Sequence, residues 1–95
     1  MELEEAQDMM RQIYFKRDCK RGLNHALLRT FEELAELNNA IIQEKRRDLV
    51  MDELADVLAW ICSLANLLDI DLAEALHTKY SGVCSKCDRS PCICP

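Results

Sequence analysis

Two acidic motifs are the residues of this chain whose types and spacing are best suited to chemistry. The first is Glu33-x-x-Glu36, and the second is Glu53-x-x-Asp56. At about 100° per residue, acids three positions apart on a helix project from one side on successive turns. Four carboxylates on two neighbouring helices suit a hard cation such as Mg²⁺, which prefers oxygen ligands and keeps waters for substrate phosphates. The spacing therefore predicts a divalent-metal site.

Each motif also has an ordinary interpretation. Glutamates are common on exposed helix surfaces, so Glu33 and Glu36 alone are equally consistent with a solvated face. Glu53 and Asp56 lie at the shoulder of an apolar stripe, where burial costs free energy unless a positive group lies between them. An Arg or Lys from another helix can also supply that charge. The Glu-x-x-His pattern of di-iron bundles is not met, because Asn39 stands three positions after Glu36.

Four helices are expected to position these motifs. The expected elements are a first helix over 3–20 followed by Gly22, a second from an Asn24 cap to about Arg46, a third from an Asp48 cap to about Leu68, and a fourth that begins after Asp71 and ends near 80–82. The connection between the second and third helices is short, so they are predicted to be antiparallel neighbours.

The two longest helices each carry an apolar stripe that is expected to form the core. On the second helix the stripe comprises Leu27, Leu28, Phe31, Leu34, Ala35, Asn38, Ile41 and Ile42. On the third helix it comprises Val50, Leu54, Val57, Leu58, Ile61, Leu64, Ala65 and Leu68. With Leu27 placed at zero, Glu33 and Glu36 fall near roughly 240° and 180° around the helix. They are therefore expected on the side away from that stripe.

Composition limits the classes of fold and partner. The chain has 95 residues, 49% hydrophobic and only 5% aromatic, which favours one all-α domain. Its formal net charge of -5 argues against a nucleic-acid partner, which would require a basic face. No segment reaches the roughly 18 apolar residues of a membrane span, and the acidic N-terminus does not resemble a signal peptide. A cytoplasmic location without membrane attachment is expected.

The residues around the two motifs resemble a known family over roughly 9–80. The resemblance rests on Glu32-Glu33-Leu34-Ala35-Glu36-Leu37, Glu53-Leu54-Ala55-Asp56-Val57-Leu58, Leu64-Ala65-Asn66, Ile70-Asp71-Leu72-Ala73-Glu74-Ala75-Leu76 and Lys79-Tyr80. In this order they are similar to the all-α nucleoside triphosphate pyrophosphohydrolases, and within them to the small MazG-like branch. The resemblance implies a four-helix bundle that is completed by oligomerisation, as a homodimer or homotetramer.

The resemblance also implies an enzymatic activity. Such enzymes cleave a nucleoside triphosphate, NTP or dNTP, into the monophosphate and pyrophosphate. The metal-binding acids of the family fall on Glu33, Glu36, Glu53 and Asp56, with Glu32 as the adjoining acid, and the expected ion is Mg²⁺ or Mn²⁺. Such an ion can neutralise phosphate oxygens and lower the pKa of a bound water, and either Glu33 or Glu36 can activate that water.

Cationic side chains are needed to bind the phosphates. The candidates are Lys16 and Arg17, which accompany the aromatic pair Tyr14-Phe15, and Lys79, which matches a lysine at the end of the last helix of the family. Trp60 can stack on a base, but a lone Trp beside a core stripe is more often packing. Asn66 is expected to be structural, and a contact between subunits is the suggested role.

Two other functions remain compatible with the sequence. The first is that of a phosphoribosyl-ATP pyrophosphohydrolase, an enzyme with a similar fold and a similar set of motifs. A helical adaptor without catalytic activity would use only its cysteine-rich end for binding. Absence of Mg²⁺-dependent turnover, with retained zinc and a bound partner, would distinguish the adaptor from both enzymes.

The cysteine-rich end has its own metal-ligand spacing, Cys84-x2-Cys87-x4-Cys92-x-Cys94. Four cysteines in a closed site are typical of structural Zn²⁺. An iron-sulfur cluster and a reduced, flexible tail are the alternatives. The expected organisation is a helical domain over 1–82 and a metal-binding tail over 83–95. The remaining cysteines, Cys19 and Cys62, are expected to be small buried hydrophobic residues.

Overall fold

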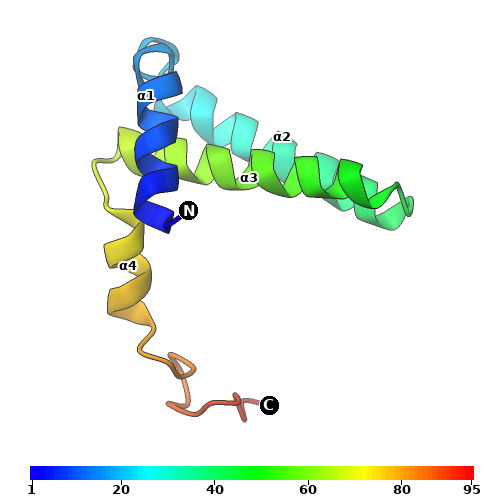
Figure 1. Ribbon diagram of the computed structural model, residues 1–95, viewed down its shortest axis with the longest axis vertical. Coiled ribbons are helices and arrows are strands. Elements are labelled where there is room, and N and C mark those ends of the chain that lie inside the picture. The colour runs from blue at the N-terminus through cyan, green and yellow to red at the C-terminus, as the bar shows by residue number, and fades with distance from the viewer.

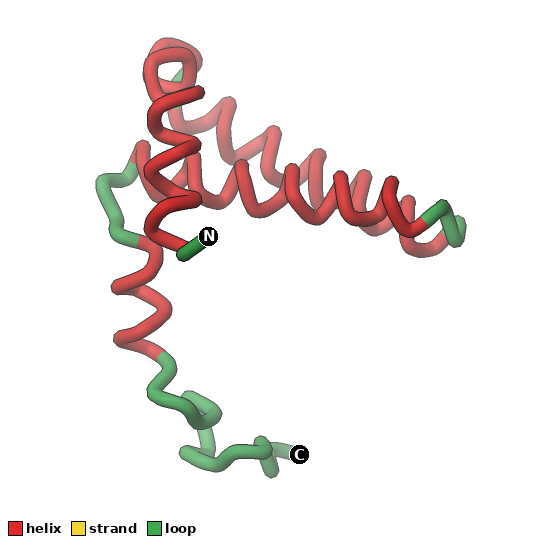
Figure 2. Tube along the Cα trace, viewed as in Figure 1, coloured by secondary structure: helices red, strands yellow, loops and turns green.

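The computed structural model describes residues 1–95 as four α-helices without a strand (Figures 1 and 2). They are α1 (Leu3–Arg21), α2 (Leu23–Ile42), α3 (Arg47–Leu67) and α4 (Leu72–Lys79). Residues 80–95 contain no helix. The predicted all-α class, with four helices and a cysteine cluster at the C-terminus, is confirmed. None of the helices combines the length and the apolar character that crossing a membrane requires.

A single glycine joins α1 to α2. Gly22 has a φ of 94°, a conformation that side chains rarely tolerate, and its N–H donates to the carbonyl of Asp18. Gly22 is also the residue immediately before α2, so the prediction that Asn24 caps this helix is wrong. The positive φ redirects the chain without a linker.

The turn between α2 and α3 begins earlier than the sequence predicts. α2 ends at Ile42 rather than near Arg46, because Glu44 adopts a left-handed φ of 52° that a helix cannot continue. Arg46 precedes α3, so Asp48 is not its cap. Asp48 lies instead in the first turn, where a carboxylate still interacts favourably with the helix dipole. The predicted Asp71 cap of α4 is confirmed, since its side chain accepts from Glu74 N–H at 3.1 Å.

The helices form an open arrangement (Figure 1). α2 and α3 lie side by side as an antiparallel hairpin, α1 crosses one end of it, and α4 leads away toward the C-terminus. The radius of gyration is 15.5 Å, compared with about 12 Å for a compact domain of this length. Most of the buried residues therefore lie along the α2–α3 hairpin and where α1 crosses it.

The apolar stripe predicted as the core of α2 is largely exposed. Leu28, Phe31 and Ile42 have exposed fractions of 59%, 71% and 70%. The buried residues of α2 are instead Ala26, Glu33, Leu37 and Ala40, on the opposite side. On α3, Leu54 and Leu58 are also exposed, whereas Ala65 is buried. Periodicity identifies an apolar face but not the element that covers it, and this prediction of the core is wrong for the single chain.

Candidate functional site

Three carboxylates converge between α2 and α3. Glu33 projects from α2, while Glu53 and Asp56 project from α3, and one oxygen of each lies within 4.8 Å of the others. The antiparallel hairpin brings them together because the small residues Ala26 and Ala40 are buried on the same side of α2 as Glu33. We refer to Glu33, Glu53 and Asp56 as the carboxylate cluster.

The carboxylate cluster is partly removed from water. Glu33 is only 6% exposed, so the interpretation of its side chain as part of a solvated face is wrong. Oε2 of Glu33 and Oε2 of Glu53 are both buried and accept no hydrogen bond. A buried carboxylate oxygen without a partner is costly, and two that face one cluster require either a proton or a cation between them.

Burial and mutual repulsion both favour the protonated acids. Burial, followed by the charges of Glu36 and Asp56, raises the pKa of Glu33 above its ordinary value, and Arg29 opposes the shift. Burial also raises the pKa of Glu53, again with contributions from Glu36 and Asp56, while Lys45 acts in the opposite direction. A divalent cation would remove the repulsion that raises both pKa values.

Glu36 and Glu32 occupy different positions around the carboxylate cluster. Glu36 is exposed and lies close enough to Glu33 and Glu53 to raise the pKa of each, although it is not within the 4.8 Å group. Glu32 points elsewhere and forms an ion pair with Arg29. The same arginine donates to Glu33 Oε1 at 2.7 Å. Arg29 therefore holds one oxygen of Glu33 and leaves the other directed at the cluster.

A cleft of about 80 Å³ opens beside the cluster at Asp56. Its other lining residues are Tyr14, Arg17, Ala59, Trp60 and Ser63. The guanidinium of Arg17 stacks over the Tyr14 ring at 4.1 Å. Its Nε and one terminal nitrogen donate to the same oxygen of Asp18 at 3.3 and 3.1 Å, and Asp18 is only 3% exposed. Arg17 is thus fixed at the edge of the acidic site.

Trp60 links the basic side chains of α1 and α2. Arg17 and Arg29 lie over its ring at 5.4 and 5.7 Å, and the His25 ring is 6.5 Å from it. Cation-aromatic contacts of this kind restrain a guanidinium without neutralising it. Trp60 is therefore more than packing beside a core stripe, because it orders two cations next to the carboxylates.

The other predicted phosphate ligands lie away from this cleft. Lys16 is exposed on α1 and does not line the cleft with its neighbour Arg17. Lys79 is on α4, which packs against α1, and its Nζ lies over Tyr80 at 5.9 Å. Sequence reasoning did not identify the buried Asp18, because one acid within a run of charged residues gives no sign of burial. Its position directly after Arg17 was the only available signal.

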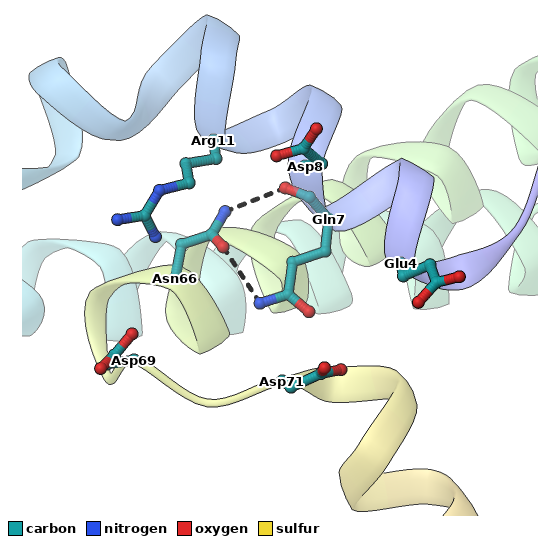
Figure 3. Close-up of a pocket in the computed structure, with 7 residues that line it drawn as sticks. All are labelled: Glu4, Gln7, Asp8, Arg11, Asn66, Asp69 and Asp71. Atoms are coloured by element: carbon teal, nitrogen blue, oxygen red, sulfur yellow. Dashed lines mark hydrogen bonds between the residues drawn. The ribbon is translucent and has the colours of Figure 1, made fainter.

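A second polar hollow, of about 240 Å³, lies between the start of α1 and the end of α3 (Figure 3). Gln7 and Asn66 face each other there: Gln7 Nε2 donates to Asn66 Oδ1 at 3.0 Å, and Asn66 Nδ2 donates to the Gln7 carbonyl at 3.1 Å. Gln7 Oε1 also accepts from Leu72 N–H at 2.8 Å. This network joins α1, α3 and the start of α4, so Asn66 has a structural role within the chain.

The tail brings its four cysteines together. The Sγ atoms of Cys84, Cys87, Cys92 and Cys94 all lie within 4.8 Å of one another. This cluster could hold a metal ion and is separate from the carboxylate cluster. Cys62 is buried as predicted, whereas Cys19 is exposed, so that prediction is wrong for Cys19.

Comparison with known proteins identifies the family but not a closely related protein. The family model of the MazG nucleotide pyrophosphohydrolase domain matches residues 21–89, which include both acidic motifs. No curated protein matches the chain. Because the match covers more than half of the sequence, the chain belongs to the MazG nucleotide pyrophosphohydrolase domain family.

Proposed function

We propose that this chain is a Mg²⁺-dependent nucleoside triphosphate pyrophosphohydrolase that releases the monophosphate and pyrophosphate. The family match supports nucleotide pyrophosphohydrolysis as the general activity. The proposal that the activity depends on Mg²⁺ rests on two buried carboxylate oxygens, Glu33 Oε2 and Glu53 Oε2, that have no hydrogen-bond partner in the protein.

The donor set fits a hard divalent cation. Mg²⁺ and Mn²⁺ prefer carboxylate oxygens, and the cluster offers one such oxygen from each of three side chains. When bound, the ion would neutralise phosphate oxygens and lower the pKa of a coordinated water. The protein residues assigned to it are Glu33, Glu53 and Asp56, with Glu36 adjacent. Zinc at the four tail cysteines is a separate proposal that depends on other atoms.

Arg17 is the side chain best placed to bind the triphosphate. It shares the cleft with Asp56, and its orientation is fixed by Tyr14 on one side and Asp18 on the other. A guanidinium held in this way can donate two parallel hydrogen bonds to phosphate oxygens. Arg29 adds positive charge nearby, although its ion pairs with Glu32 and Glu33 neutralise part of that charge.

The arrangement favours Glu36 over Glu33 as the residue that orients the attacking water. One oxygen of Glu33 accepts from Arg29, and the other is buried within the cluster. Glu36 is exposed at the edge of the same cluster, where solvent can reach its carboxylate. A general base must be within hydrogen-bond reach of the water that it activates. Glu33 is therefore assigned to cation binding and Glu36 to the water.

Association of two or more copies is part of the proposal. The side chains of Leu27, Leu28, Phe31, Leu34, Ile41 and Ile42 form an exposed apolar stripe along α2. Stripes of this kind are normally covered by another surface, and a second copy would complete the helical bundle. Sedimentation velocity should show a dimer or tetramer for the parent chain and dissociation for Phe31→Glu, with Ile93→Glu in the tail as a control. A monomeric parent would contradict this assembly.

Product analysis tests the proposed reaction directly. Nucleoside triphosphates incubated with the protein and Mg²⁺ in ¹⁸O-enriched water should yield only monophosphate and pyrophosphate by ³¹P NMR, with the label in one product. These products require cleavage between the α and β phosphates, so that the β and γ phosphates leave together. Diphosphate and orthophosphate as initial products would contradict the proposal, even if turnover depended on Mg²⁺. No hydrolysis of any nucleotide, combined with retained metal in the tail, would favour the adaptor interpretation.

A further inference from the structure

The segment 83–95 lacks the interactions that normally order a chain. It contains neither helix nor strand, and none of its side chains is fully buried. Only two backbone hydrogen bonds lie within it: Cys84 N–H donates to the Arg89 carbonyl, and Asp88 N–H donates to the Cys84 carbonyl. Nevertheless, its four cysteine sulfur atoms lie within 4.8 Å of one another. An apolar core cannot explain this convergence, because the segment has none.

The distances between the sulfur atoms match a tetrahedral metal site. Cys84 Sγ and Cys94 Sγ are 3.8 Å apart, and Cys87 Sγ and Cys92 Sγ are 3.9 Å apart. Four thiolates at about 2.3 Å from one Zn²⁺ lie about 3.8 Å from each other in a tetrahedron. A disulfide would require a separation of about 2.05 Å. The pairs are therefore too far apart for disulfides and are at the spacing expected of thiolates around one ion.

The backbone around the sulfurs also restricts their positions. Asp88 follows Cys87 in a left-handed conformation, with a φ of 57°, and turns the chain back toward Cys84. Lys86 N–H donates to Cys84 Sγ at 3.4 Å, and Cys94 N–H donates to Cys92 Sγ at 3.3 Å. Hydrogen bonds of this kind restrict the orientation of the ligand atoms.

We propose that Cys84, Cys87, Cys92 and Cys94 bind one Zn²⁺ in a closed, tetrahedral site that folds the segment 83–95. Four protein ligands leave no position for water, so the site is structural and not catalytic. Soft thiolates select Zn²⁺ over Mg²⁺, whereas the carboxylate cluster has the opposite preference. The two metals are thus separated by ligand chemistry, and the zinc site does not depend on the hydrolase activity.

Metal content of the complete chain tests the proposal. Protein purified under reducing conditions without added metal should contain about one zinc per chain by elemental analysis. Replacement of the zinc by Co²⁺ should give the intense visible bands of a tetrahedral, sulfur-ligated ion. Cys87→Ser and Cys92→Ser should each lose the zinc and the cobalt spectrum. Cys19→Ser, which changes an exposed cysteine on α1, should retain both.

Several results would overturn the zinc site. Zinc near zero in the parent chain, stoichiometric iron with the colour of a cluster, or two disulfides found by thiol counting would each contradict it. Equal loss of zinc in Cys19→Ser and Cys92→Ser would show that the ion is bound elsewhere. The helix content of each variant should be measured by circular dichroism. Loss of zinc supports the site only in a variant that retains its helices. The parent measurement is decisive even if a variant fails to fold.

Discussion

The carboxylate cluster and the cysteine cluster position their ligands by opposite means. Glu33 and Glu53 come from two long helices and are held by the packing of α2 on α3. The four cysteines come from one short segment with almost no packing of its own. A helical site keeps its shape without an ion but brings negative charges together, whereas a loop site keeps its shape only with the ion. Removing ligands should therefore affect activity in the first and local order in the second.

Neutralising the acids should have the largest effect. Glu36→Gln and Glu53→Gln should each lower kcat/KM by at least about 100-fold. This is more than the loss typical of changes to residues that only hydrogen-bond to the metal ligands. The fold should survive, because the change removes charge but little volume, and relief of repulsion can raise the Tm. Asp52→Asn, at an exposed position beside Glu53, is the matched control and should leave kcat/KM nearly unchanged. Activity close to that of the parent in both glutamine variants would exclude the proposed site.

Arg17 should have the next largest effect. Arg17→Ala should lower kcat/KM by about 10- to 100-fold, the equivalent of about one charge-assisted hydrogen bond to phosphate. Arg17→Lys should recover only part of this loss, because an ammonium cannot donate in the same fork. Lys16→Ala, at the adjacent exposed position, should change kcat/KM by less than about twofold. Equal losses for Lys16→Ala and Arg17→Ala would contradict the assignment of Arg17 to the phosphates.

The two raised pKa values predict a moderate dependence of stability on pH. The folded chain holds protons on Glu33 and Glu53 more tightly than the unfolded chain does. Their contribution to stability is therefore fully present below the ordinary pKa of 4.5 and is lost as pH rises through the raised values. In the presence of a chelator, the Tm of the parent should fall as pH rises from 4.5 through the raised pKa values. The fall should be smaller in Glu53→Gln. Saturating Mg²⁺ should also reduce the fall in the parent.

Thermal denaturation of the parent and Glu53→Gln at matched pH values measures this effect. The difference between the two proteins isolates the contribution of the cluster from that of the other acids. A Tm difference that does not change with pH, with and without Mg²⁺, would show that the pKa values of the cluster are not raised in solution.

The smallest effect on catalysis is expected from the tail. Cys92→Ser should lower the Tm by a few degrees, the shift expected for about 1 kcal/mol in a domain of this size. It should leave kcat within about twofold of the parent, because the cysteines do not line the cleft beside Asp56. Loss of all activity in a variant that keeps its helices would show that the tail contributes to the active site.

Sequence reasoning predicted different parts of the molecule for different physical reasons. The helices and the Asp71 cap follow from local periodicity and capping, which depend on neighbouring residues. The convergence of the cysteines follows from their short spacing. The burial of Glu33 was not predictable in this way, because the apolar stripe at Leu28 and Phe31 identified the wrong face of α2 as the one that packs on α3.

The cationic side of the site shows the same limit. Lys16 and Arg17 are adjacent in sequence, but only Arg17 lines the cleft, since neighbouring helical residues point about 100° apart. The contacts of Arg17 and Arg29 with Trp60 depend on how three helices cross, and periodicity does not encode crossing geometry. Long-range contacts of this kind became visible only in the structure.

Manganese binding tests the central proposal, that the acids of α2 and α3 hold a divalent cation, most directly. Mn²⁺ can be titrated into the complete chain without nucleotide, and free Mn²⁺ can be followed by electron paramagnetic resonance. The parent, Asp52→Asn and Cys92→Ser should bind Mn²⁺ equally, whereas Glu53→Gln should bind at least about tenfold more weakly. Equal binding by Glu53→Gln and the parent, or loss of binding in Cys92→Ser alone, would contradict the assignment of the divalent cation to the carboxylate cluster.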